Sequence, residues 1–208
     1  MKYEMGISGA IIVSGHNGYE PFIGSVAIKG DRIEKVVEGS LEKEDCGKWI
    51  DGSGKILMPG LVNAHCHGDM TLARGLGDDL TLLEQNEKFA DTEWFYTLIS
   101  DEDRYYSRQL TYCEALLSGT TFIMENMYWG LGEDSVKAMV ETGIKGALAE
   151  DIRVSFVRPD DFVSDAFLEA YGEVCQKNGI LPILGGISEE DYETGRLKRI
   201  LEIARKHD

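Results

Sequence analysis

The sequence predicts an α/β protein in which a short all-β stretch precedes strands that alternate with helices. Residues 1–58 contain short apolar runs separated by turns, without helical periodicity. Residues 59–208 contain four strand–helix units in a row, which favours parallel strands joined by right-handed crossovers. We therefore expect two parts, 1–58 and 59–208, which meet at Pro59-Gly60.

In the first part we expect five short strands. An apolar run ends at Val13, and apolar residues alternate from Phe22 to Ile28. Gly30-Asp31 is a two-residue turn signal that leads into the next strand. The expected strands span residues 6–13, 22–28, 32–37, 48–50 and 55–58.

In the second part the expected strands are apolar and β-branched, and the helices show helical spacing. The first helix, 101–118, is predicted from an i, i+4, i+7, i+11 pattern formed by Tyr106, Leu110, Cys113 and Leu117. The expected strands span residues 61–65, 120–125, 144–150 and 180–187. Ser188 is a candidate cap for a last helix, whose expected buried face is Leu197, Ile200, Leu201 and Ala204.

Charge excludes two classes of partner, and the cysteine content indicates the redox state of the thiols. The chain has 37 acidic and 21 basic residues, a formal net charge of −16, which argues against nucleic acid or an anionic membrane as partner. The four cysteines form no CxxC pair and indicate reduced thiols. No signal peptide or membrane span is evident, so we expect a cytoplasmic protein.

Two histidines follow the first expected strand of the second part. Alternation along a strand places His65 and His67 on one face and Cys66 on the other. Neutral imidazole is a common ligand of zinc-like metals, and a long connection follows this strand. The tripeptide alone leaves another interpretation open, in which these are polar residues at a strand end, or one is catalytic and the other packed.

The segment around the histidines resembles a known family. Residues 55–80 read KILMPGLVNAHCHGDMTLARGLGDDL, and 55–84 resemble the opening of the amidohydrolase superfamily. The nearest branch is that of the S-adenosylhomocysteine and methylthioadenosine deaminases and the chlorohydrolases, which act on cyclic amidines. Residues 114–121 resemble the segment between this family's first helix and second strand, and residues 1–58 resemble part of its small N-terminal β-sandwich.

The resemblance implies a metal-dependent hydrolase on a (β/α)8 barrel of the TIM-barrel type, of which residues 59–208 supply the first four units. His65 and His67 match two metal ligands, and the resemblance implies one divalent metal, with zinc expected first and iron as the alternative. The metal would activate a water that attacks a ring carbon of a small heterocycle such as an aminopurine. The other ligands and the catalytic acid or base are expected beyond Asp208.

Asp69 and Glu125 are candidate substrate-binding residues. Asp69 follows the histidines by two residues, and Glu125 closes the second expected strand at the same edge of the sheet. The alternatives are a solvated loop carboxylate for Asp69 and a structural hydrogen bond for Glu125. Two segments, Gln85-Asn86 and 185–190, depart from the family pattern at places that line its substrate pocket, which puts nucleoside specificity in doubt.

Two other functions stay open at this point. In the first alternative the chain is a non-catalytic truncated copy that persists as an oligomer. In the second it belongs to a different amidohydrolase branch that acts on cyclic amides. Four strand–helix units leave two open sheet edges, so we expect a homo-oligomer.

Overall fold

The structure is a computed structural model that describes residues 2–15, 20–88, 99–127, 133–151, 164–185 and 196–206. The chain divides into two compact units, Met1–Gly60 and Leu61–Asp208. Gly60 therefore ends the first unit, close to the boundary expected at Pro59-Gly60.

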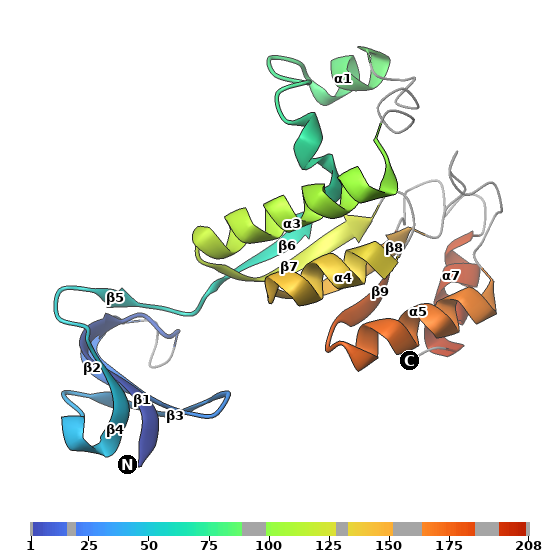
Figure 1. The fold of residues 1–208 in the computed structure, drawn as a ribbon. Helices are drawn as coiled ribbons and strands as arrows, with labels where there is room; N and C mark the ends of the chain where they lie inside the picture. The colour runs from blue at the N-terminus through green and yellow to red at the C-terminus, as the bar shows by residue number, and fades with distance from the viewer. Residues whose placement is uncertain are drawn as a thin grey trace. The chain divides into compact units, whose positions relative to one another are not determined.

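The first unit is one five-stranded sheet with strands of mixed direction (Figure 1). β2 (Phe22–Lys29) pairs antiparallel with β1 (Tyr3–Ile12) and with β3 (Arg32–Glu38). After the short 3-10 turn η2 (Lys43–Asp45), β4 (Cys46–Asp51) and β5 (Ile56–Leu57) run parallel to β1. All five expected strands are present, and Gly30 adopts φ +59° in the turn between β2 and β3, a conformation that favours glycine.

The core of this sheet is small. Tyr3, Ala27 and Cys46 are buried together, and the partly buried Leu41 and Trp49 pack against them. The buried hydroxyls of Ser8 and Ser25 bond to each other at 2.9 Å, which satisfies two polar groups inside the sheet. A second sheet layer is not among the described residues of this unit, so the β-sandwich stays an expectation.

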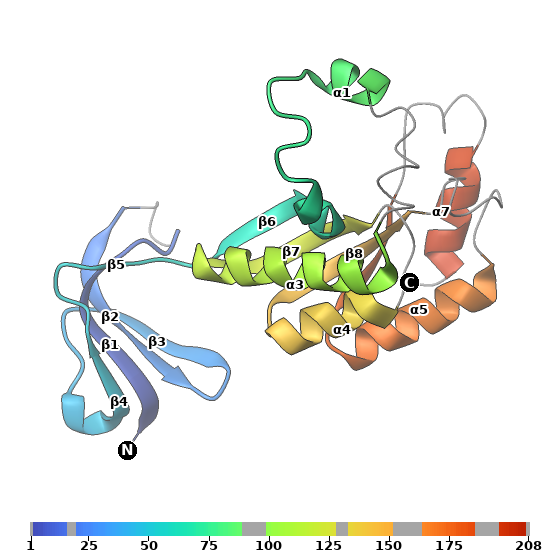
Figure 2. The ribbon, with the colours of Figure 1, turned by 45° about the horizontal axis from the view of Figure 1, so that its top comes forward.

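The second unit is built on a parallel sheet in the order β6 (Leu61–Cys66), β7 (Thr120–Met127), β8 (Lys145–Asp151) and β9 (Leu181–Gly185). Helices α3 (Asp101–Leu117), α4 (Glu133–Thr142) and α5 (Asp165–Lys177) lie on one face of it (Figures 1 and 2). Helix α7 (Arg196–Lys206) follows β9 in the chain. The prediction of an α/β fold with a parallel sheet is confirmed.

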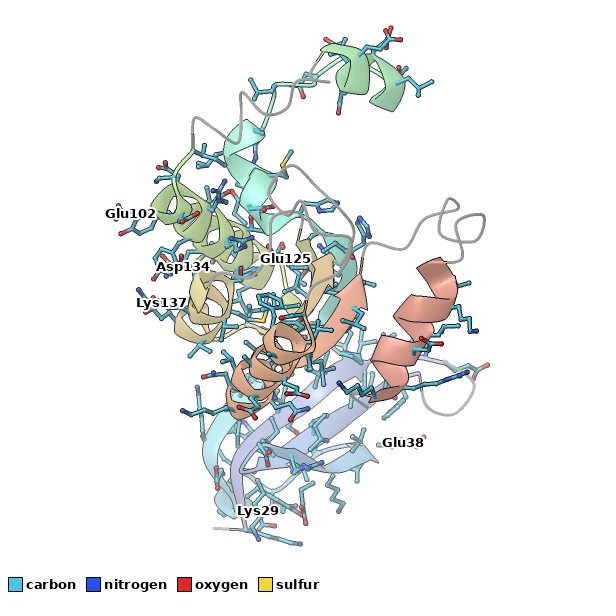
Figure 3. The ribbon with its side chains drawn as sticks, turned by 90° about the vertical axis from the view of Figure 1, so that its right-hand side faces the viewer. Lys29, Glu38, Glu102, Glu125, Asp134 and Lys137 are labelled. Carbon is cyan, nitrogen blue, oxygen red and sulfur yellow. The ribbon has the colours of Figure 1, made fainter. Side chains whose placement is uncertain are left out.

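The main core lies between this sheet and its helices. Its buried residues come from each layer and include Tyr112 of α3, Met139 of α4, Tyr171 and Cys175 of α5, and Ile123 and Leu148 of the sheet. The outer faces of the helices carry charged side chains, as Glu102, Asp134 and Lys137 show in Figure 3.

The buried face of α3 differs from what its apolar pattern suggests. The helix is present, and a capping box between Ser100 and Asp103 begins it, but the four residues of the pattern are exposed. Ser107, Arg108 and Tyr112 are buried instead. Ser107 and Arg108 bond to residues of the segment after β6. These two side chains are therefore buried because of their hydrogen-bond partners and not because they are hydrophobic.

The connection after β6 contains two elements that the sequence did not predict, the 3-10 segment η3 (Gly68–Ala73) and helix α1 (Leu82–Lys88). Both are too short to display helical periodicity. Ser188 and the end of the fourth expected strand lie outside the described residues. Of the expected face of the last helix, Leu197 and Ala204 are partly buried and Leu201 is exposed. None of the helices in the described segments is long and apolar enough to span a membrane.

Tyr171 ties α5 to the sheet and allows a test of the fold. Its hydroxyl donates to the carbonyl of Leu148 in β8 and accepts from the N–H of Ile183 in β9 at 3.3 Å. In Tyr171→Phe both backbone groups lose this partner, so we expect the free energy of unfolding to fall by about 1–3 kcal/mol. Urea unfolding followed by circular dichroism measures it, with Tyr106→Phe as control because Tyr106 is exposed. Equal stability of the two variants would contradict the role of Tyr171.

Candidate metal centre

The two histidines meet at the carboxyl end of β6. His65 lies in the strand and is exposed, and His67 lies one residue past its end and is partly buried. Their ring centroids are 5.0 Å apart and the rings are nearly perpendicular, at 87°. The two side chains therefore lie on one face of the strand, as the alternation predicted.

Asn126 of β7 contacts both rings. Its backbone carbonyl is 2.7 Å from Nδ1 of His67, and its side-chain Nδ2 is 3.0 Å from Nδ1 of His65. The backbone N–H of His65 is also bonded, to Oδ1 of Asn63 at 3.2 Å. The rings are thus held by β7 as well as by their own strand.

Cys66, between the two histidines, points to the opposite face and packs against the main core. Burial raises the pKa of its thiol to about 12, and the nearby charges of Glu125 and Asp69 add to this. Metal ligation requires the thiolate. Cys66 is therefore a core residue on the face of β6 opposite the two histidine rings.

Beneath the histidines lies a buried ion cluster centred on Arg108 of α3. Its Nε is 2.7 Å from Oε1 of Glu125, and its NH2 nitrogen is 3.2 Å from Oδ2 of Asp69. The side chain of Tyr112 donates to the other oxygen of Glu125. Arg108 is 3% exposed, Asp69 1% and Glu125 0%, and Figure 3 shows Glu125 among the side chains between the sheet and its helices.

Burial and charge act against each other in this cluster. Burial raises the pKa of Asp69 to about 6, although the Arg108 charge lowers it. Burial also raises the pKa of Tyr112 well above its ordinary value, as does the charge of Glu125. The phenol therefore stays protonated and donates a hydrogen bond to Glu125. For Arg108, burial lowers the pKa, but the charges of Glu125 and Asp69 together raise it by more than burial lowers it. The guanidinium therefore stays charged.

The segment that follows the histidines is also held through its backbone. Ser107 donates to the carbonyls of Gly68 and Asp69 at 3.1 Å, and Thr111 donates to the carbonyl of Gly68 at 3.0 Å. Gly68 lies directly over Glu125: a Cβ atom at Gly68 would come within 2.9 Å of the Glu125 carboxylate. This close approach is the reason that glycine follows His67.

The substrate-binding prediction for Asp69 and Glu125 does not fit this arrangement. Both carboxylates face α3 and are bonded to Arg108, so neither reaches solvent. For Glu125 the alternative, a structural hydrogen bond, matches the structure. For Asp69 the alternative of a solvated carboxylate does not match either, because η3 turns the side chain inward.

Three residues of this region were missed by the sequence analysis. Arg108 and Tyr112 lie in a helical stretch of polar composition that resembles a solvated face. Asn126 follows Glu125 at the end of β7, and its position at the carboxyl end of a parallel strand was the one signal that could have identified it.

The histidine pair fits two positions of a divalent metal site. Both rings have Nδ1 close to Asn126, and imidazole is a nitrogen ligand that suits zinc. Within the described segments, no group of three or more His, Cys, Asp or Glu side chains could hold a metal.

Comparison with known proteins confirms the resemblance drawn from residues 55–84. The chain is 39% identical over 127 residues to the 5'-deoxyadenosine deaminase of Methanobrevibacter smithii, and 38% identical over 127 residues to the 5-methylthioadenosine/S-adenosylhomocysteine deaminase of Dictyoglomus turgidum. These alignments cover 61% and 60% of the chain and 28% of each relative. No family model matches the chain.

Solved structures resemble the fold over more of the chain. Atrazine chlorohydrolase from Arthrobacter aurescens, complexed with zinc, matches 87% of the chain with a TM-score of 0.71 and 18% identity. An adenosine deaminase from Xanthomonas campestris with bound zinc matches 86% with a TM-score of 0.67 and 21% identity. The matches cover 46% and 42% of those structures, which are amidohydrolase-type TIM-barrel enzymes.

The Arg108 cluster predicts a large effect of one substitution. Arg108→Met leaves two carboxylates buried without a counter-charge, so we expect the free energy of unfolding to fall by about 3–5 kcal/mol. Arg108→Lys keeps the charge but not the fork that reaches both carboxylates, and we expect a smaller loss.

The matched control is Arg74→Met. Arg74 also pairs with a carboxylate of the same helix, Glu114, but this pair is exposed and we expect its loss to change stability little. Chemical denaturation measures all three variants. A similar loss of unfolding free energy in Arg108→Met and Arg74→Met would show that the buried cluster contributes no more to stability than the exposed pair does.

Proposed function

We propose that this chain is part of a metal-dependent aminohydrolase that removes an amino group from a cyclic amidine, such as the adenine ring of a nucleoside. The observation that carries the proposal is the pair of imidazoles at the carboxyl end of β6. The ring centroids of His65 and His67 lie 5.0 Å apart, and Asn126 contacts both rings. The carboxyl end of the strands is where α/β barrels place their active sites.

Sequence similarity favours deamination over dechlorination. The deaminase relatives are 38–39% identical to this chain over 127 residues, whereas the chlorohydrolase is 18% identical and supports the fold alone. A purine nucleoside with a shortened or modified 5' end is therefore the substrate class that we propose first. Because the chain spans less than a third of these relatives, this activity is proposed for the whole protein.

The chain's own residues supply binding and orientation. His65 and His67 would hold a divalent metal, with zinc as the first choice since two structural neighbours contain it. When bound, the metal lowers the pKa of a coordinated water so that hydroxide is present at neutral pH. Asn126 orients the two rings, and the Arg108 cluster holds the segments that carry them.

The parallel sheet fits the first half of a larger barrel. We propose that residues 59–208 form the first four strand–helix units of a (β/α)8 barrel and that residues 1–58 form part of a small β-sandwich. Support comes from the order β6–β7–β8–β9, which follows the chain, and from the placement of α3, α4 and α5 on one face. Further metal ligands would come from the remaining barrel strands.

Zinc binding and ammonia release test the proposed function together. In the whole protein we expect His65→Ala/His67→Ala to lose bound zinc, measured by atomic absorption after dialysis, and to lose the release of ammonia from 5'-deoxyadenosine. The matched control is His16→Ala/His207→Ala, which removes the other two histidines of the chain and should keep both properties.

A substrate panel separates the branches of the family. Ammonia release from adenine nucleosides, with chloride release from a chlorotriazine and ring opening of a cyclic amide absent, supports the proposed substrate class. Zinc binding and ammonia release that survive loss of both His65 and His67 would contradict the assignment of the site.

A further inference from the structure

A buried serine in the middle of α3 faces the segment that follows His67. Ser107 is 0% exposed, and its hydroxyl lies 3.1 Å from the carbonyl oxygens of both Gly68 and Asp69. The same hydroxyl accepts from the backbone N–H of Leu72 at 3.3 Å. A buried hydroxyl needs partners, and Ser107 finds these three in η3, which lies 35 to 39 residues earlier in the chain.

Thr111, one turn further along α3, repeats this contact. Its hydroxyl donates to the carbonyl of Gly68 at 3.0 Å and bonds with the hydroxyl of Thr71. It also lies 3.0 Å from the carbonyl of Ser107 in its own helix. Residues i and i+4 share one face of a helix, so both hydroxyls reach the buried Gly68 from the same side. A carbonyl oxygen has two lone pairs, and Ser107 and Thr111 supply a donor for each.

The backbone that these hydroxyls hold is continuous with His67. His67 is the N-cap of η3, and its carbonyl accepts from the N–H of Met70 at 3.0 Å. A shift of the Gly68 carbonyl would therefore turn the peptide next to the atom from which the His67 side chain projects. The ring itself lies against β7, with Nδ1 2.7 Å from the carbonyl oxygen of Asn126. His67 thus has two supports, α3 through its backbone and β7 through its ring.

We propose that Ser107 and Thr111 are positioning residues for the metal pair. From α3 they fix the start of η3, so that the ring of His67 stays 5.0 Å from the ring of His65, measured between centroids. His65 lies within β6 and is placed by the sheet, whereas His67 lies past the last residue of the strand and depends on η3. This inference rests on the proposed metal site, although the spacing of the two rings is a property of the chain without metal.

The zinc affinity of the whole protein tests the proposal. Ser107→Ala and Thr111→Val each remove one hydroxyl, and we expect either change to weaken zinc binding by about tenfold, as losses of groups that orient metal ligands do. Thr111→Ser keeps the hydroxyl and should bind zinc as tightly as the unaltered protein. Isothermal titration measures the affinities. Unaltered zinc affinity in both Ser107→Ala and Thr111→Val would overturn the proposal, as would a tenfold loss in Thr111→Ser.

Two controls separate positioning from a general loss of stability. Thr142→Val removes a hydroxyl that bonds to the carbonyl of Ala138 within its own helix, α4. Tyr171→Phe removes a bond between α5 and the sheet and is expected to lower stability. Both should keep the zinc affinity of the unaltered protein, and thermal unfolding of every variant measures the stability. If Tyr171→Phe weakened zinc binding as much as Ser107→Ala, affinity would follow stability alone and the proposal would be overturned.

The spacing of the rings gives a second measurement that needs no metal. With labelled histidines, the nuclear Overhauser effect between the ring protons of His65 and His67 should weaken in Ser107→Ala and Thr111→Val and persist in both controls. An unchanged effect in the two hydroxyl variants would contradict the positioning role. If the unaltered protein bound no zinc, the proposed function would fail, while this effect would still decide whether Ser107 and Thr111 set the distance between the rings.

Discussion

The buried guanidinium of Arg108 is the interaction on which the candidate metal centre depends. It joins two segments that are far apart in the chain, because one side reaches Asp69 after β6 and the other reaches Glu125 in β7. Asp69 lies two residues past His67, and Glu125 directly precedes Asn126. The same side chain therefore anchors the segment that carries the histidines and the strand end that orients them. An arginine suits this place because its planar fork serves two carboxylates at once.

Burial of these charged groups is unfavourable in free energy, and the rest of the core must offset it. Three charged groups lie almost without solvent, and one carboxylate oxygen, Oδ1 of Asp69, has no hydrogen-bond partner among the residues that the structure describes. Buried ion pairs of this kind contribute less to stability than to a single defined geometry, and that is the role we infer here. The phenol of Tyr112 and the close contact of Gly68 complete the shell around Glu125, so the cluster has little freedom to rearrange.

Much of the local structure was predictable because it depends on neighbours in the chain. Strand β7 follows from a short apolar, β-branched run and β8 from a short apolar run, and the existence of α3 follows from the helical spacing of its apolar residues. The histidine pair followed from the two-residue repeat of a strand, which needs no knowledge of the fold. The buried face of α3 was not predictable, because Ser107 and Arg108 are buried by partners 38 and 39 residues away.

The sequence by itself determined the α/β class, the alternation of strands and helices and the pairing of His65 with His67, since each follows from the period of a local pattern. The tertiary structure alone decided that Asp69 and Glu125 face Arg108, and that Asn126 contacts both rings. The physical reason is that the direction of a carboxylate or an amide is set by hydrogen bonds across neighbouring strands and helices. Those bonds exist only after β6, β7 and α3 have packed together.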